Sequence, residues 1–156
     1  TKALAARVDY ISVGTNDLAQ YILAADRTNA RVTTPNDTLH PAVLNAIGMI
    51  IRDAHAQNTP VSVCGEMAGD PAGALVLLGM GVDALSMSPA SFGRVKLVIR
   101  AFTSKRARTL ADEALEQEDE RQVRGLLNDA LEGAGILKHW PRVEDRAGSD
   151  VGTFTE

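Results

Sequence analysis

The chain has 156 residues, of which 45% are hydrophobic and 4% aromatic, and its formal net charge is -4. This composition suits one modest domain, and the mild acidity with few aromatic residues disfavours nucleic acid as the main partner. No apolar run reaches the roughly 18 residues of a membrane-spanning helix, so no membrane partner is expected. A single cysteine, Cys64, forms no internal disulfide and indicates a reducing, cytoplasmic location.

Three short apolar runs, each followed by a helical pattern, make up the first two thirds of the chain. Strands are expected at 10–13, 61–63 and 83–87, and helices at 18–25, 41–57, 71–78 and 91–102. Pro41 suits the first position of its helix, and Gly79 and Gly81 suit a helix end. This alternation predicts an α/β fold in which parallel strands are joined by right-handed crossovers.

The remaining residues divide into a helical part and a tail. Residues 104–131 are rich in Ala, Leu, Glu and Arg and lack proline, which predicts one or two further helices. From Pro141 onward, Gly, Ser, Asp and Arg mix without an apolar period. We therefore expect one domain over 1–135 and a disordered tail over 136–156.

The stretch 9–27, DYISVGTNDLAQYILAADR, turns from apolar to polar where the first strand ends. In α/β proteins this edge of the sheet faces the ligand. Gly14 lets the backbone turn tightly and approach a ligand. Asn16 can donate a hydrogen bond, Asp17 offers a hard oxygen for Mg²⁺, and Arg27 matches phosphate or carboxylate. Taken alone, Asn16 and Asp17 are more often a turn or helix cap, and Arg27 a surface charge.

Four blocks in order carry a resemblance: SVGTNDLAQYILAADR, LHPAVL, VCGEMAGD and LSMSP. Together they resemble phosphoenolpyruvate-utilising enzymes, and in particular enzyme I of the bacterial phosphotransferase system, over about residues 7–135. The segments VSVCGEMAGDPAGALVLLGMG and VKLVIRAFTSKRAR favour the nitrogen-related branch of that family.

The resemblance implies the C-terminal part of a TIM (β/α)8 barrel, about three of its eight strand–helix units, followed by C-terminal helices. We thus expect a piece of a longer protein with open strand edges. The intact enzyme would transfer the phosphoryl group of phosphoenolpyruvate, with Mg²⁺, to a histidine on another domain and then to a histidine-containing phosphocarrier protein. It would release pyruvate and form a homodimer, whereas the chain alone is expected to be inactive.

The resemblance also implies residue roles. Asp17 becomes a Mg²⁺ ligand, Asn16 a phosphate contact and Arg27 a neutralising charge, while Cys64 becomes the general acid that protonates the enolate. Without the resemblance, a lone cysteine after Val-Ser-Val is more often a small buried hydrophobic residue. A thiol at a strand tip is nevertheless mostly protonated at neutral pH and can act as an acid.

Five other polar residues are expected to be structural. His40, His55 and His139 lack the sequence context of the family's phosphorylated histidine. Glu66 and Asp70 are expected to order the loop after the second strand rather than to bind metal.

Two other functions stay open. Pyruvate phosphate dikinase and phosphoenolpyruvate synthase share the GTND block, although the CGEMAGD form and the short C-terminal extension favour the phosphotransferase. Alternatively, the chain is a non-catalytic module for dimerisation or regulation.

Overall fold

The computed structural model describes residues 1–24 and 38–136. Three parallel strands form one sheet in the order β1-β2-β3, as the α/β pattern predicts. The strands are β1 (Ile11–Gly14), β2 (Val61–Cys64) and β3 (Ala84–Ser86). Gly14 pairs with Cys64, and Cys64 pairs with Ser86, so the three strands end level at one edge.

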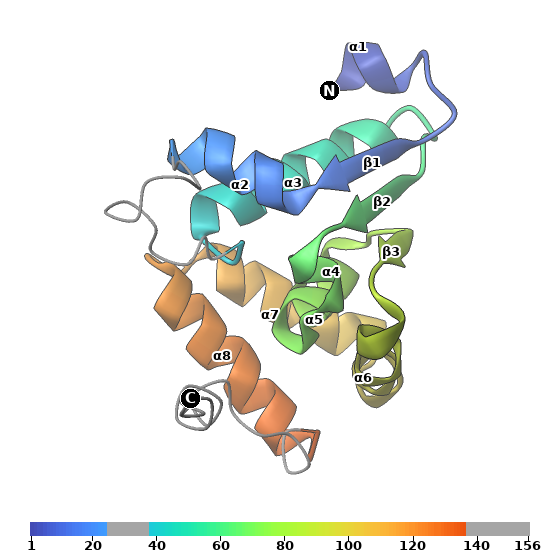
Figure 1. Ribbon diagram of the computed structural model, residues 1–156. Helices are drawn as coiled ribbons and strands as arrows, with labels where there is room; N and C mark the ends of the chain where they lie inside the picture. Colours follow the sequence, from blue (N-terminus) through green and yellow to red (C-terminus); the bar gives the residue numbers. More distant parts are fainter. Residues whose placement is uncertain (25–37, 137–156) are drawn as a thin grey trace, which may run out of the picture.

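The helices alternate with the strands and then continue beyond them (Figure 1). They are α1 (Lys2–Ala5), α2 (Thr15–Leu23), α3 (Pro41–His55), α4 (Glu66–Gly69), α5 (Pro71–Met80), α6 (Pro89–Ala101), α7 (Ser104–Leu115) and α8 (Glu120–Gly133). The single-turn helices α1 and α4 were not predicted. Within the described ranges, no helix is long and apolar enough to cross a membrane. The predicted tail lies outside the described residues, apart from its first residue.

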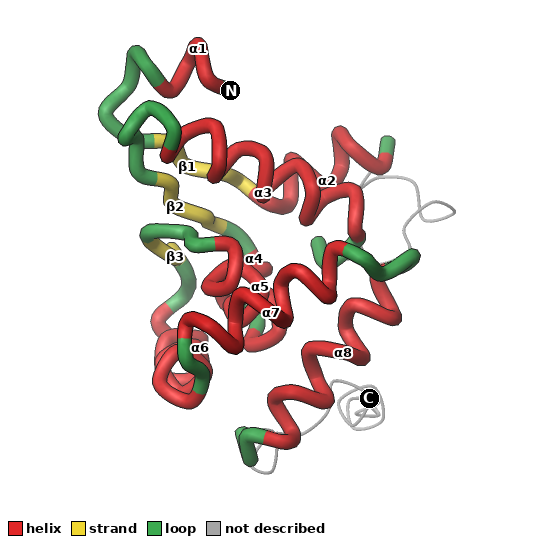
Figure 2. Tube along the Cα trace, turned by 180° about the vertical axis from the view of Figure 1, so that it is seen from behind, coloured by secondary structure: helices red, strands yellow, loops and turns green. Residues whose placement is uncertain are grey.

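Helices cover one face of the sheet. In Figure 1, α3 lies behind β1 and β2, and in Figure 2, seen from behind, α3 lies in front of them. The covered face carries the buried Val13, Val61 and Val63. Because side chains alternate along a strand, the opposite face carries Ser12, Gly14, Ser62, Cys64, Ala84 and Ser86, all half-buried or exposed. These six residues are called the open face.

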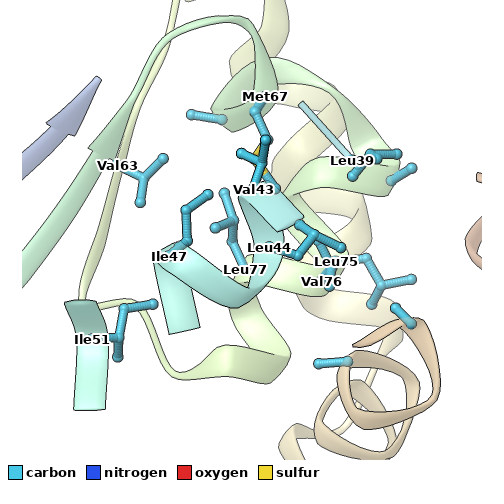
Figure 3. Packing of buried hydrophobic residues seen from close by; sticks show 14 of the residues in the cluster. Leu39, Val43, Leu44, Ile47, Ile51, Val63, Met67, Leu75, Val76 and Leu77 are labelled. Carbon is cyan, nitrogen blue, oxygen red and sulfur yellow. The ribbon is translucent and has the colours of Figure 1, made fainter. Parts of the chain in front are cut away.

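The core fills the space between the covered face, α3 and α5 (Figure 3). Helix α3 contributes an apolar stripe at helical spacing, which includes Val43, Ile47 and Ile51. Helix α5 is buried almost all round because α7 packs along it on the side away from the sheet. This makes a third layer, which the sequence indicated only as extra helices.

Gly79 has a packing role. The sequence predicted that it helps to end its helix, but α5 continues to Met80, and Gly81 forms the left-handed C-cap with φ 83°. A Cβ on Gly79 would overlap the carbonyl oxygen of Ala107 and lie 2.7 Å from the Cβ of Ala111. The missing side chain therefore allows α5 and α7 to approach closely.

Gly79→Ala is expected to lower the free energy of unfolding. Overpacking costs about 1–3 kcal/mol, which exceeds the roughly 1 kcal/mol that alanine gains over glycine in a helix. Gly125 in α8 is the matched control, because a Cβ there meets no atom within 4 Å. Gly125→Ala should raise stability by about 0.5–1 kcal/mol. Urea denaturation of both variants tests this, and a gain in both would show that α5 and α7 can move apart freely.

Asp83 ties the amino ends of β2 and β3 to α3. Its carboxylate oxygen Oδ2 accepts a 2.7 Å hydrogen bond from the Val61 N–H and lies 2.8 Å from His55 Nε2. The hydrogen bond from Val61, followed by that of His55, lowers the pKa of Asp83 below its usual value. His55 therefore has a structural contact, as does His40, whose Nδ1 accepts the N–H of Ala42 at the start of α3.

This arrangement gives stability an acid-sensitive component. A carboxyl group whose pKa is lowered by folding stabilises the protein above its unfolded pKa of about 3.8, and this stabilisation is lost as pH falls further. Asp83→Asn should cost at most about 1 kcal/mol at neutral pH, because Asp83 is 45% exposed. The difference in free energy of unfolding between the two proteins should shrink below about pH 4. If the difference in free energy of unfolding between the two proteins stays constant down to pH 2.5, the Asp83 carboxylate does not supply this acid-sensitive stability.

Candidate functional site

A pocket of about 590 Å³ opens at the edge where the strands end. Such a carboxyl edge is where α/β proteins bind ligands. Its wall comes from the first turn of α2, the end of β2, α4, the start of α5, and the segment from β3 into α6. The lining residues are Asn16, Cys64, Gly65, Glu66, Gly69, Asp70, Pro71, Ser86, Met87, Ser88, Ser91 and Arg94.

Two of the four site residues expected from the sequence meet at this pocket. Asn16 in the first turn of α2 and Cys64 at the end of β2 both line it. Asp17 also lies in the first turn of α2, where its side chain is exposed, but it is not among the lining residues. Arg27 lies outside the described residues.

Gly65 allows Asn16 and Cys64 to approach each other. It has φ 110°, a left-handed conformation that favours glycine. A Cβ on Gly65 would lie 2.7 Å from Thr15 Oγ1 and 3.3 Å from Asn16 Oδ1. The buried Thr15 hydroxyl donates a 3.1 Å hydrogen bond to the Cys64 carbonyl, which fixes α2 against the end of β2.

The sequence interpretation gave the conformational role to the wrong glycine. Gly14 was expected to make the tight turn, but its φ of −82° is open to any residue. A Cβ on Gly14 would also meet no atom within 4 Å. The glycine required by backbone geometry is Gly65, and its signal in the sequence is its place directly after the Val61–Cys64 strand.

Gly65→Ala is expected to destabilise the protein and displace Asn16. A side chain at this φ costs about 1–3 kcal/mol, before the contact with Thr15 is counted. Gly14→Ala is a matched control, because both glycines are helix N-caps. The control should lose less than about 1 kcal/mol, the usual difference between glycine and alanine at an N-cap. Equal losses in urea denaturation would show that Gly65 has no special role.

Beside the lining carboxylates Glu66 and Asp70, the pocket edge also carries groups that can bind an anion. Helices α2 and α6 begin at this edge, and within the described residues no side chain caps either N-terminus. Their first N–H groups and the positive ends of their dipoles are thus directed to the pocket edge. Arg94 of α6 adds a cation to the lining. The sequence interpretation missed Arg94, whose signal is its position one turn after the polar Ser86–Ser91 segment.

Asp70 has a structural role at the pocket rim. Its Oδ2 accepts from the Gly73 N–H at the start of α5 and lies 3.2 Å from Nη1 of Arg124 in α8. Asp70 is therefore a helix cap and an ion-pair partner. Glu66 begins α4 and lines the pocket as an exposed carboxylate.

Comparison with known proteins decides the family. Residues 1–104 match the family described as "PEP-utilising enzyme, PEP-binding domain". The chain belongs to this family. The expected resemblance to phosphoenolpyruvate-utilising enzymes is thereby confirmed.

Relatives of this chain carry names that fit the family. It is 46% identical over 133 residues to the "Phosphoenolpyruvate-dependent phosphotransferase system" protein of Salmonella typhimurium, covering 85% of this chain and 18% of that protein. It is 42% identical over 130 residues to the "Phosphoenolpyruvate-protein phosphotransferase" of Haemophilus influenzae, covering 83% of this chain and 23% of the relative. A "Multiphosphoryl transfer protein" of Xanthomonas campestris is 46% identical over 123 residues, covering 79% of this chain and 15% of that protein. The chain therefore spans less than a quarter of each of these relatives, and the Haemophilus relative is named as an enzyme.

Whether this chain could bind a metal ion depends on which oxygen, nitrogen and sulfur side chains lie together. In the described part of the chain, no three His, Cys, Asp or Glu side chains gather as metal ligands. Mg²⁺ commonly takes one or two carboxylates and fills its remaining positions with water and substrate phosphate. An exposed Asp17 carboxylate beside Asn16 fits one ligand of such a site.

Proposed function

We propose that this chain forms the C-terminal part of the phosphoenolpyruvate-binding barrel of an enzyme I-type phosphotransferase. The main support is that Asn16 and Cys64 share one pocket at the strand ends, in a chain whose residues 1–104 match the PEP-binding domain. We place it in the nitrogen-related branch on the resemblance of its VSVCGEMAGDPAGALVLLGMG segment.

The two edge strands and the open face support closure of the sheet into a barrel. Within the described residues, β1 and β3 each pair with one strand, β2. Strand β3 is mostly exposed, and β1 buries Val13 alone. Exposed strand edges pair readily with other strands. Further strands of the same barrel would pair with both edges and cover Ser12, Ser62 and Cys64.

The proposed chemistry divides between binding and proton transfer. Phosphoenolpyruvate carries a phosphate and a carboxylate, so the Asn16 amide and the first N–H groups of α2 can donate to its phosphate oxygens. The guanidinium of Arg27 would neutralise phosphate charge. When bound with Asp17 as a ligand, Mg²⁺ supplies positive charge that offsets the phosphate. Cys64 would then donate its thiol proton to the enolate carbon, giving pyruvate.

The later phosphoryl transfers require the longer protein that we propose. The phosphoryl group would pass to a histidine on another domain and then to a histidine-containing phosphocarrier protein. The two edge strands and the exposed Phe92 and Leu97 of α6 leave surface for the rest of the barrel and for a second copy of the chain.

The decisive experiment uses the longer protein that contains this chain. It is incubated with labelled phosphoenolpyruvate, Mg²⁺ and a histidine phosphocarrier protein, without nucleotide. The expected result is label on the carrier and release of pyruvate. A requirement for nucleotide would instead identify a dikinase or synthase, and no binding of phosphoenolpyruvate would identify a non-catalytic module.

A further inference from the structure

The open face brings a second polar side chain to Cys64. The hydroxyl oxygen of Ser12 in β1 lies 3.9 Å from the Cys64 sulfur in β2, within the range of a hydrogen bond donated to sulfur. Strand register explains the contact. Ser12 pairs with Ser62 and Gly14 with Cys64, so Ser12 and Cys64 are diagonal neighbours on one face. Gly14, directly opposite Cys64, has no side chain to separate them.

Two other hydroxyl groups nearby, those of Thr15 and Ser62, have different acceptors. Thr15 donates to the backbone carbonyl of Cys64, not to its sulfur. Ser62, on the same face and two residues before Cys64, donates to the carbonyl of Ile11 at 3.4 Å. Of these three hydroxyl groups, that of Ser12 is directed to the sulfur, so it is the one placed to stabilise charge that develops there.

We propose that Ser12 is a positioning residue for Cys64, and that its hydroxyl stabilises the thiolate left after proton donation. This inference rests on the proposed function of Cys64 as the acid. In the step, the S–H bond breaks and a C–H bond forms at the enolate carbon. The enolate's negative charge moves to the sulfur as pyruvate forms, and a proton from solvent later restores the thiol. A donated O–H hydrogen bond is stronger to a thiolate than to a thiol, so it favours the transfer.

The test measures the thiolate directly. Because Cys64 is the single cysteine of the 156-residue chain, thiolate absorbance near 240 nm reports on this residue once the titration of Cys64→Ala, which carries the signal of the two tyrosines, is subtracted. Ser12→Ala should raise the pH at which half of Cys64 is thiolate by about 0.5 pH unit, which leaves about threefold less thiolate at a fixed lower pH. Ser12→Thr, which keeps the hydroxyl, should restore the original midpoint.

Ser62→Ala is the matched control. It removes a hydroxyl from the same face and a neighbouring position, but its hydrogen bond goes to a backbone carbonyl. Its midpoint should equal that of the unchanged protein. A Ser12→Ala midpoint that does not move, or a Ser62→Ala midpoint that moves as far, would overturn the inference. Circular dichroism of each variant verifies that the fold is retained.

The charged groups around the pocket are the same in all of these variants. They are Glu66 and Arg94 in the lining, Asp70 with its partner Arg124, and Asp17 in the first turn of α2. Their effect on the thiolate is thus common to every titration and cancels in the comparison.

Kinetics of the longer protein separate the two proposals. Ser12→Ala should lower kcat about threefold at unchanged KM for phosphoenolpyruvate, because the thiolate forms only during turnover. If the midpoint shifts but neither Ser12→Ala nor Cys64→Ala affects turnover, the proposed acid role of Cys64 fails. If Cys64→Ala abolishes turnover, but Ser12→Ala changes neither the thiolate midpoint nor kcat, the inference about Ser12 fails alone.

Discussion

Cys64→Ala in the longer protein is expected to slow pyruvate formation from phosphoenolpyruvate by about 10²–10⁴-fold, the usual contribution of a positioned acid. Binding of phosphoenolpyruvate should remain close to normal, because proton donation follows the departure of the phosphoryl group. The substitution removes one sulfur atom from the half-buried open face, so it should not disturb the core. Single-turnover kinetics and calorimetric binding measure the two quantities separately.

The control for this variant is Ser62→Ala on the same strand and face, which should retain turnover. Normal turnover in Cys64→Ala would reduce Cys64 to a packing residue. Loss of binding together with turnover would mean that the variant damages the pocket, and Cys64 would then have no demonstrated part in the chemistry.

Asp17→Ala is expected to remove the Mg²⁺-dependent part of phosphoenolpyruvate binding. A methyl group cannot replace a hard oxygen ligand. Loss of an outer-shell partner of a metal commonly costs about 10–100-fold in affinity, so loss of a ligand should cost at least that much. Calorimetry of the longer protein with phosphoenolpyruvate, in the presence and absence of Mg²⁺, measures the effect.

Glu66→Ala supplies the comparison, because Glu66 is an exposed carboxylate of the pocket lining to which no metal role is assigned. The Glu66→Ala variant should keep the Mg²⁺ dependence of phosphoenolpyruvate binding. Asp17→Asn also preserves a polar side chain in the first turn of α2, and therefore separates lost charge from a damaged helix start. Unchanged affinity in Asp17→Ala would leave Asp17 as a residue that favours the helix N-terminus.

Local patterns predicted the order of elements well. Apolar runs placed all three strands, and Pro41 and Pro71 marked helix starts that the structure retains. The main local error was the start of α2, which begins at Thr15 rather than near Leu18. Polar residues after a strand resemble a loop in sequence, but here they form the first turn of α2, which begins at the pocket edge.

The site was less predictable because its geometry depends on neighbours that are distant in sequence. The meeting of Asn16 with Cys64 depends on β1 lying beside β2, which no local pattern states. The need for Gly65 comes from Thr15, fifty residues earlier in the chain. Arg94 reaches the pocket from the third strand–helix unit. The family resemblance supplied roles for single residues, but not the contacts among them.

The close crossing of α5 and α7 bears on where the folding unit ends. The family match stops at residue 104, where α7 begins, yet α7 covers the outer side of α5. Dividing the chain at that point would expose α5 side chains such as Leu75 and Val76 to water. It would also remove Arg124 from Asp70 at the rim of the pocket. The unit that holds the pocket together therefore extends about thirty residues past the sequence-defined domain, to the end of α8 at Gly133.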